Sequence, residues 1–140
     1  MGMTGLKSFD QSLIKTKEWL KDLQEELHYE DEQQAYTAMR AVLHALRDRL
    51  SVEEAANFAA QLPMLLMGVY YENWKPENKP LKIRDQQEFF DKVAEELPQK
   101  EYDSKRITDG VMKVVRKHVT GGKIEEMKKH FPSDLMGLFG

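Results

Sequence analysis

The chain of 140 residues contains no cysteine. Without thiols it cannot form a disulfide, use a cysteine nucleophile or hold zinc through thiolate ligands. The length is that of one ordinary domain and is sufficient to bury a real core. The sequence therefore excludes thiol chemistry but not a stable globular fold.

Long apolar runs are also absent. No run reaches the roughly 18 residues that a helix needs to cross a bilayer, and residues 1–6 lack the charged-then-apolar layout of a secretory signal. An apolar share of 41% and a charged share of 32% are typical of a soluble globular protein. We therefore expect a cytoplasmic protein with no membrane partner.

The chain has no strong excess of charge of either sign, because its net charge is −3. Residues 100–130 are locally basic, with 9 Lys or Arg against 5 Asp or Glu. A nucleic-acid partner would use such a segment, but helical spacing places these charges on the solvated sides of amphipathic helices. We therefore expect no nucleic-acid partner.

Strand signals are missing as well. The sequence shows no sustained alternation of polar and apolar residues and no Asn-Gly hairpin, and Asp109-Gly110 lies inside a helical pattern. Apolar residues instead recur at helical steps. The first face expected to be buried comprises Phe9, Leu13, Leu20, Leu23 and Leu27. Helix starts are predicted at Ser8, at the acidic stretch 30–32, and at Ser51, Asp85 and Thr120.

A short segment after Pro63 is apolar on nearly every side. Proline fits the first turn of a helix, so a new helix is predicted from Pro63 to about Tyr71. Helices that are apolar all round are usually central to a core. We expect this one to be buried.

The second half of the sequence repeats the first at a shift of 69 positions. Residues 38–70 and 107–139 align without a gap and share six identities: Val42, Arg47, Pro63, Leu66, Met67 and Gly68 fall on Val111, Arg116, Pro132, Leu135, Met136 and Gly137. The shared prolines predict helix starts, and the shared glycines predict places where two helices come close.

The repeat completes the predicted organisation. The sequence predicts an all-α fold, a single globular bundle of about eight helices built from two repeats related by a pseudo-twofold axis. One domain spans 1–140, with repeats at about 9–72 and 85–139 joined by a Pro-rich linker at 73–84.

Two runs carry a family resemblance. They are 41–56, AVLHALRDRLSVEEAA, and 60–76, AQLPMLLMGVYYENWKP. Together they closely resemble the bacterial family called domain of unknown function 2267, over about residues 10–139. The resemblance implies a small helical protein, and it brings no catalytic residues to carry over. The family pattern often has a basic residue just before the glycine, where this chain has Met67.

Two groups of residues are candidate binding sites. Tyr70, Tyr71, Glu72 and Trp74 follow the apolar helix in the first repeat alone and form either a binding edge or, for the aromatics, part of the core. Arg40, His44 and Arg47 lie on one helical face and form either an anion site or a solvated face.

No arrangement of residues predicts catalysis. Adjacent carboxylates such as Glu95-Glu96 diverge on a helix, and no nucleophile elbow, phosphate loop or metal motif occurs. We therefore predict no catalytic residues, metal or cofactor. The expected function is a non-enzymatic binding or regulatory module acting through a protein partner or a homodimer. The alternative is a small-molecule or anion-binding protein with a polar pocket near Arg40, His44, Arg47 and Tyr71.

Overall fold

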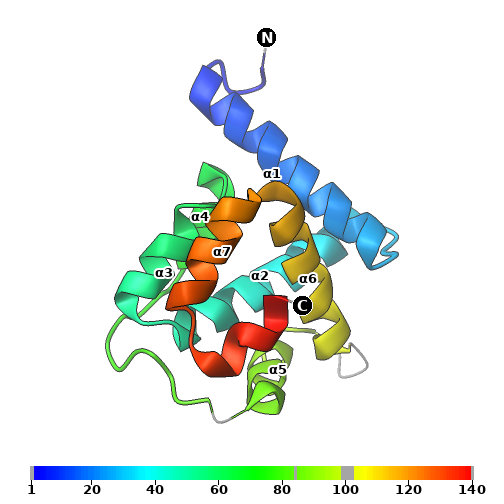
Figure 1. Cartoon of the computed structure of the whole chain (residues 1–140). Coiled ribbons are helices and arrows are strands. Elements are labelled where there is room, and N and C mark those ends of the chain that lie inside the picture. Colours follow the sequence, from blue (N-terminus) through cyan, green and yellow to red (C-terminus); the bar gives the residue numbers. More distant parts are fainter. Residues whose placement is uncertain (1, 84, 99–102, 140) are drawn as a thin grey trace.

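A computed structural model of the chain describes residues 2–83, 85–98 and 103–139. Residue 84 of the predicted linker and residues 99–102, which overlap the predicted basic segment, lie outside the described residues, as do 1 and 140. The elements are α1 (Lys7–Glu26), α2 (Glu32–Arg49), α3 (Val52–Ala59), α4 (Met64–Tyr71), α5 (Gln86–Ala94), α6 (Ser104–His118), α7 (Gly121–His130) and the 3-10 helix η1 (Ser133–Phe139). These eight helices, with no strand among the described residues, confirm the all-α prediction (Figure 1).

Helix α2 lies at the centre of the fold. It packs against α1, α3, α4, α5 and α6, and every residue from 41 to 47 is buried. Around it, one continuous core draws side chains from both halves of the chain, including Leu23, Val42, Phe89 and Val111. Almost every face of α2 is therefore a packing surface, and polar groups on it must find partners inside the protein.

Most predicted helix starts are confirmed. Asp31 and Ser51 form complete capping boxes at the starts of α2 and α3, and the Asp85 side chain accepts a hydrogen bond from the first turn of α5. Thr120 occupies the cap position of α7 but makes no capping hydrogen bond through its side chain. The Ser8 start is wrong: α1 begins at Lys7.

The end of the chain returns to α2. The segment after Pro132 is a 3-10 helix rather than the expected α-helix. Its Asp134 accepts two hydrogen bonds from Arg49 at the end of α2, one of them from Nε at 2.9 Å. Both side chains are only 15% exposed. This pair attaches the end of the second half to the first.

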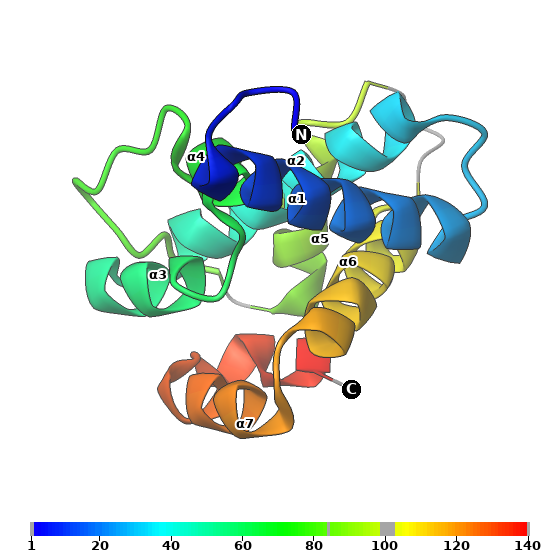
Figure 2. The ribbon, with the colours of Figure 1, turned by 90° about the horizontal axis from the view of Figure 1, so that it is seen from above.

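Helix α1 crosses the bundle and continues past it. Its first turns project beyond the other helices (Figure 1), and Figure 2 shows it crossing in front of α2. It packs on α2, α4 and α6. Among the described residues, no helix is long and apolar enough to cross a lipid bilayer.

Candidate functional site

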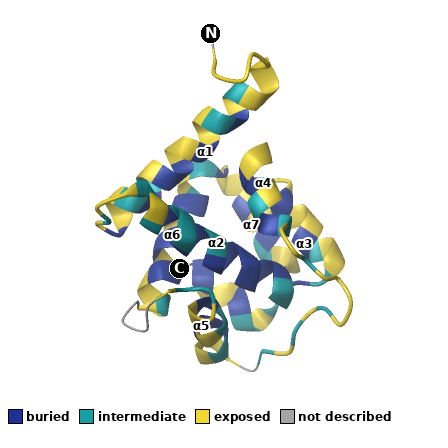
Figure 3. Ribbon diagram, turned by 180° about the vertical axis from the view of Figure 1, so that it is seen from behind, coloured by how far each residue is buried: buried dark blue, intermediate teal, exposed yellow. Residues whose placement is uncertain are grey.

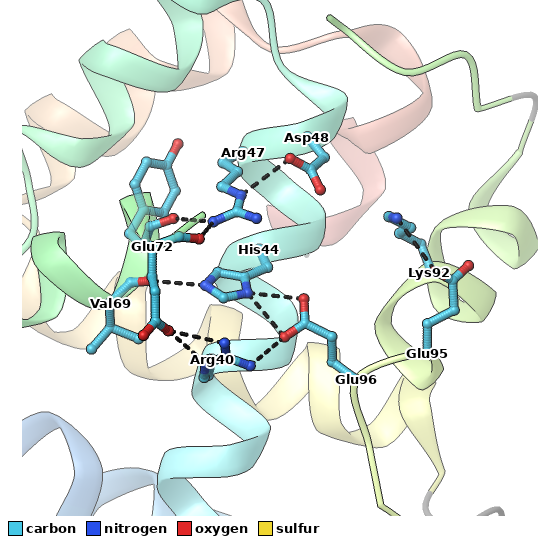
Figure 4. A network of polar contacts seen from close by, with 10 residues as sticks. Arg40, His44, Arg47, Asp48, Val69, Glu72, Lys92, Glu95 and Glu96 are labelled. Atoms are coloured by element: carbon cyan, nitrogen blue, oxygen red, sulfur yellow. Dashed lines mark hydrogen bonds and ion pairs between the residues drawn. The ribbon is translucent and has the colours of Figure 1, made fainter. Parts of the chain in front are cut away.

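A cluster of polar side chains joins α2 to the end of α4 and to the turn that follows α5 (Figure 4). At its centre His44 is only 2% exposed. Its Nε2 lies 2.7 Å from the carbonyl oxygen of Val69, and its Nδ1 lies 2.9 Å from both carboxylate oxygens of Glu96. A carbonyl and an ionised carboxylate only accept hydrogen bonds, so both ring nitrogens donate and the geometry suits the imidazolium form.

Arg40 lies one turn before His44 and bridges two carboxylates. Its Nε donates to Glu72 at 3.0 Å, and one terminal nitrogen donates to Glu96 at 2.7 Å. Partial burial opposes the charge, but the hydrogen bond that Arg40 donates to Glu72 and the charges of both glutamates raise the pKa of Arg40 above its ordinary value. Arg40 and His44 therefore share the carboxylate of Glu96.

Arg47 closes the other end of the cluster and is 6% exposed. One terminal nitrogen donates to the carbonyl oxygens of Tyr70, at 3.0 Å, and of Glu72, and Nε donates to Asp48 at 3.1 Å. The last carbonyls of a helix have no partner within the helix. Arg47 and His44 supply those partners for α4.

The cluster contains equal numbers of opposite charges when His44 is protonated. Arg40, His44 and Arg47 stand against three carboxylates, those of Asp48, Glu72 and Glu96. The structure thus brings the three predicted residues together, but each is already bonded to a carboxylate or a carbonyl of the chain. The solvated-face prediction is wrong for His44 and Arg47, and anion binding by the stripe stays a prediction.

The second predicted group spreads from the core to the surface. Tyr70 is completely buried, its hydroxyl donates to the carbonyl of Ala55 at 2.9 Å, and burial raises the pKa of its phenol. Tyr71 lies edge-on to Tyr70 and contacts Trp74, with ring centres 5.1 and 5.3 Å apart, and both are half-buried. Tyr70 is therefore a core residue, and Tyr71 and Glu72 offer the more accessible positions for a partner.

An uncovered apolar surface lies where α1 passes the start of α4. The apolar residues and the glycine left exposed on the two sides of this crossing are Leu6, Phe9, Met64, Leu65 and Gly68, and we call this set the α1–α4 apolar face. The two helices pack together, and the backbone N–H of Leu65 donates to the Ser12 hydroxyl at 2.8 Å. In Figure 3 the first turns of both helices are coloured as exposed.

This surface corrects two predictions. Phe9 was expected on a buried face, but it is half exposed because the start of α1 extends beyond the other helices. The all-apolar α4 was expected to be central, but it buries only Leu66 and Tyr70 fully, and Met64 and Leu65 remain half exposed. Tyr71, seven residues after Met64, lies on the same side of the helix.

Gly68 occupies the middle of the exposed side of α4. A Cβ atom built at Gly68 would meet no atom of the chain within 4 Å. At Gly110 the same atom would lie 2.8 Å from Leu27, which explains that glycine by close packing. The predicted close helix approach at Gly68 is therefore absent within the described part of the chain.

The sequence profile of one protein family matches residues 16–138. It describes uncharacterized conserved proteins and is called DUF2267. The chain belongs to the DUF2267 family. The match covers both halves of the fold and confirms the resemblance seen in the sequence. No curated protein matches the chain.

In this DUF2267 chain, sequence reasoning missed Glu96. The sequence shows it only as one of two adjacent glutamates, whereas the structure makes it the acceptor shared by Arg40 and His44. Local periodicity contains no signal for this contact, which spans more than 50 positions. His118, outside the cluster, lies 2.6 Å from Asp22. The described residues contain no group of three His, Asp or Glu that could hold a metal ion.

Proposed function

We propose that this DUF2267 protein is a cytoplasmic binding or regulatory module that acts through protein–protein contacts, with the α1–α4 apolar face as its contact surface. One observation carries the proposal: side chains with the sequence pattern of a core are left uncovered by the chain's own fold. Exposed apolar surface of this kind is typical of sites that another molecule covers.

The position of the face suits a contact surface. Figure 1 shows the start of α1 standing clear of the bundle, which leaves room for a partner beside α4. From residue 62 to residue 71 the chain carries no charge. A partner therefore meets apolar groups without having to desolvate an ion, and charged residues are indeed depleted at the centres of protein interfaces.

Of the residues that the sequence singled out, Tyr70 is buried on the inner side of α4 and the polar cluster binds the end of this helix. Tyr71 lies at the edge of the α1–α4 apolar face. The anion-binding alternative is weaker, because Arg40, His44 and Arg47 already bind groups of the chain.

We also infer that the two halves are repeats related by a pseudo-twofold axis. Two contacts support this. Arg116, the counterpart of Arg47, donates to the carbonyl of Leu138 at 3.3 Å, so each arginine binds a carbonyl at the end of the last helix of its own half. The equivalent helices α3 and α7 also pack against each other. A groove of about 180 Å³ lies between them, and its lining includes the equivalent pair Phe58 and Met127.

Site-specific photo-crosslinking in living cells tests the proposed surface. A benzophenone side chain at Leu65 is expected to give crosslinks to protein, because this position is on the face and half exposed. The matched control places the same group at Lys129, which is exposed on α7. Crosslinks from position 65 should disappear when Gly68→Glu is added. If position 65 crosslinks no more than position 129, the face is not a protein contact.

A further inference from the structure

We propose that the occupant of the α1–α4 apolar face is a second copy of this chain, held in a twofold arrangement with Phe9 of each copy over Gly68 of the other. This inference rests on the proposed function, because it names the partner of that same face. In a twofold dimer one patch contacts itself, so the patch must be complementary to its own shape and charge.

The shape of the face meets this condition. Phe9 is a large side chain that stands out from α1 and is 50% exposed. Gly68 has no side chain, whereas Met64, Leu65 and Tyr71 lie on the same side of α4, and among the described residues no atom of another segment lies within 4 Å of a Cβ atom built there. We call this low point of the helix surface the recess. The face thus carries both a projection and a recess. Two copies related by a twofold axis place each projection against the recess of the other.

The composition of α4 supports the same contact. A glycine within a helix lowers helix stability, because it adds backbone freedom to the unfolded chain and lacks a side chain to pack. Gly110 compensates for this by allowing Leu27 to approach. Gly68 has no such neighbour within the described chain, so close approach by another molecule gives this glycine a packing role.

The charge of the face also permits self-association. A patch that meets its own copy brings identical charges together, and like charges oppose each other. The five residues of the face are all uncharged. A twofold contact here therefore carries no repulsion from its centre.

The exposed apolar area of the face approaches the apolar area of a standard interface. Leu6, Phe9, Met64 and Leu65 are 55%, 50%, 55% and 49% exposed. With roughly 200 Å² for a fully exposed large aromatic side chain as the upper value for each residue, they offer at most about 400 Å² of apolar surface per copy. A standard interface buries about 800 Å² per partner, of which about 60%, or roughly 480 Å², is apolar. Gly68 and the half-buried Tyr71 at the edge contribute to the remainder.

Sedimentation equilibrium of the full chain from about 1 to 200 μM tests the proposal. The wild type should approach twice 16.4 kDa as concentration rises. Gly68→Glu should remain at 16.4 kDa throughout, because the carboxylate fills the recess and places a charge at the centre. It should keep the native circular dichroism, since a Cβ atom at this position lies in open space. Gly122→Glu, on the distant and open surface of α7, is the matched control and should associate like the wild type.

A second pair of variants tests the contact itself. Phe9→Glu and Gly68→Lys should each be monomeric, and a mixture of the two should form heterodimers, because a carboxylate from one chain then faces an ammonium group from the other. A mixture that stays monomeric contradicts the contact between Phe9 and Gly68.

The outcomes separate this inference from the proposed function. A wild type that stays monomeric at 200 μM, or a Gly68→Glu variant that still dimerises, overturns the second-copy proposal. The crosslinks from position 65 then test whether the α1–α4 apolar face contacts a different protein. Adducts at the mass of another protein support the proposed function, and an absence of adducts contradicts it. Adducts at twice the mass of the chain support both.

Discussion

Replacement of Arg47 by methionine should destabilise the fold far more than loss of a surface charge. Methionine keeps the apolar stem of the side chain and removes the guanidinium. The variant therefore isolates the hydrogen bonds to Tyr70, Glu72 and Asp48 from the packing of the stem.

The magnitude follows from the groups left behind. Two carbonyls at the end of α4 lose their donor, and a buried polar group without a partner costs about 1–3 kcal/mol. Asp48, whose side chain is 13% exposed, loses its counter-ion, and removal of one member of a buried ion pair costs about 3–5 kcal/mol. Local rearrangement admits water to some of these groups, so we expect a loss of about 3 kcal/mol in the free energy of unfolding.

Urea denaturation followed by far-ultraviolet circular dichroism measures this loss. With a slope of about 2 kcal/mol/M for a chain of this size, the midpoint should fall by about 1.5 M. Arg116→Met is the matched control, because Arg116 is half-buried and makes one hydrogen bond of 3.3 Å. Its expected loss is about 1 kcal/mol or less. Equal losses for the two variants would refute the view that Arg47 anchors α4.

Two further predictions concern the packing of α1 on α6. Gly110→Ala should lower the free energy of unfolding by about 1 kcal/mol, because its Cβ would lie 2.8 Å from Leu27 and overpacking outweighs the gain in helix propensity. Gly122 lies in open space, so Gly122→Ala should not lower the free energy of unfolding. Calorimetry of the two variants compares these effects. Partial burial opposes ionisation of Asp22, but hydrogen bonds from His118 and a neighbouring lysine outweigh it and hold the pKa below its ordinary value. The unfolded carboxylate therefore binds a proton first as pH falls, so the stability advantage of wild type over Asp22→Asn should be constant above about pH 5 and shrink as pH falls through the folded pKa. An advantage that does not change between pH 6 and pH 3 would contradict this role for Asp22.

The sequence was sufficient to predict the helices because their signals are local. Capping side chains such as Ser51 bind backbone groups three residues away. The residues that make this contact are therefore close together in the sequence, where the capping pattern can be recognised. The first helix shows the limit. Ser8 has the residue type of a cap, but the helix already includes it, and the Asp10 side chain instead accepts hydrogen bonds from Thr4 just ahead of the helix.

The candidate site could be predicted only in part, because its contacts join distant segments. Helical spacing placed Arg40, His44 and Arg47 on one face, and the repeat singled out Arg47 as shared. Neither observation shows that α4 ends against this face or that Glu96 reaches it from the turn after α5. Periodicity reports which residues share a side of a helix, but tertiary packing decides whether that side meets solvent, core or another charge.

The same limit explains the α1–α4 apolar face. An apolar pattern predicts that a helix surface is buried, but it does not predict whether the same chain or another molecule buries it. For α4, the chain covers the side with Leu66 and Tyr70 and leaves Met64 and Leu65 open. The prediction of a central helix failed because burial within one chain was assumed.

The polar cluster and the apolar face are connected through the stability of α4. A helix of eight residues is too short to persist alone in water, and this one is held at both ends: at its start by Ser12 and at its end by His44 and Arg47. The cluster therefore fixes the orientation in which α4 presents Gly68. It follows that Arg47→Met should weaken both folding and self-association, with faster amide exchange in α4, whereas Gly68→Glu should abolish association and leave the exchange rates of the monomer unchanged. If Arg47→Met leaves association intact while α4 loses its protection, the face does not depend on an ordered α4, and the link between the two features is wrong.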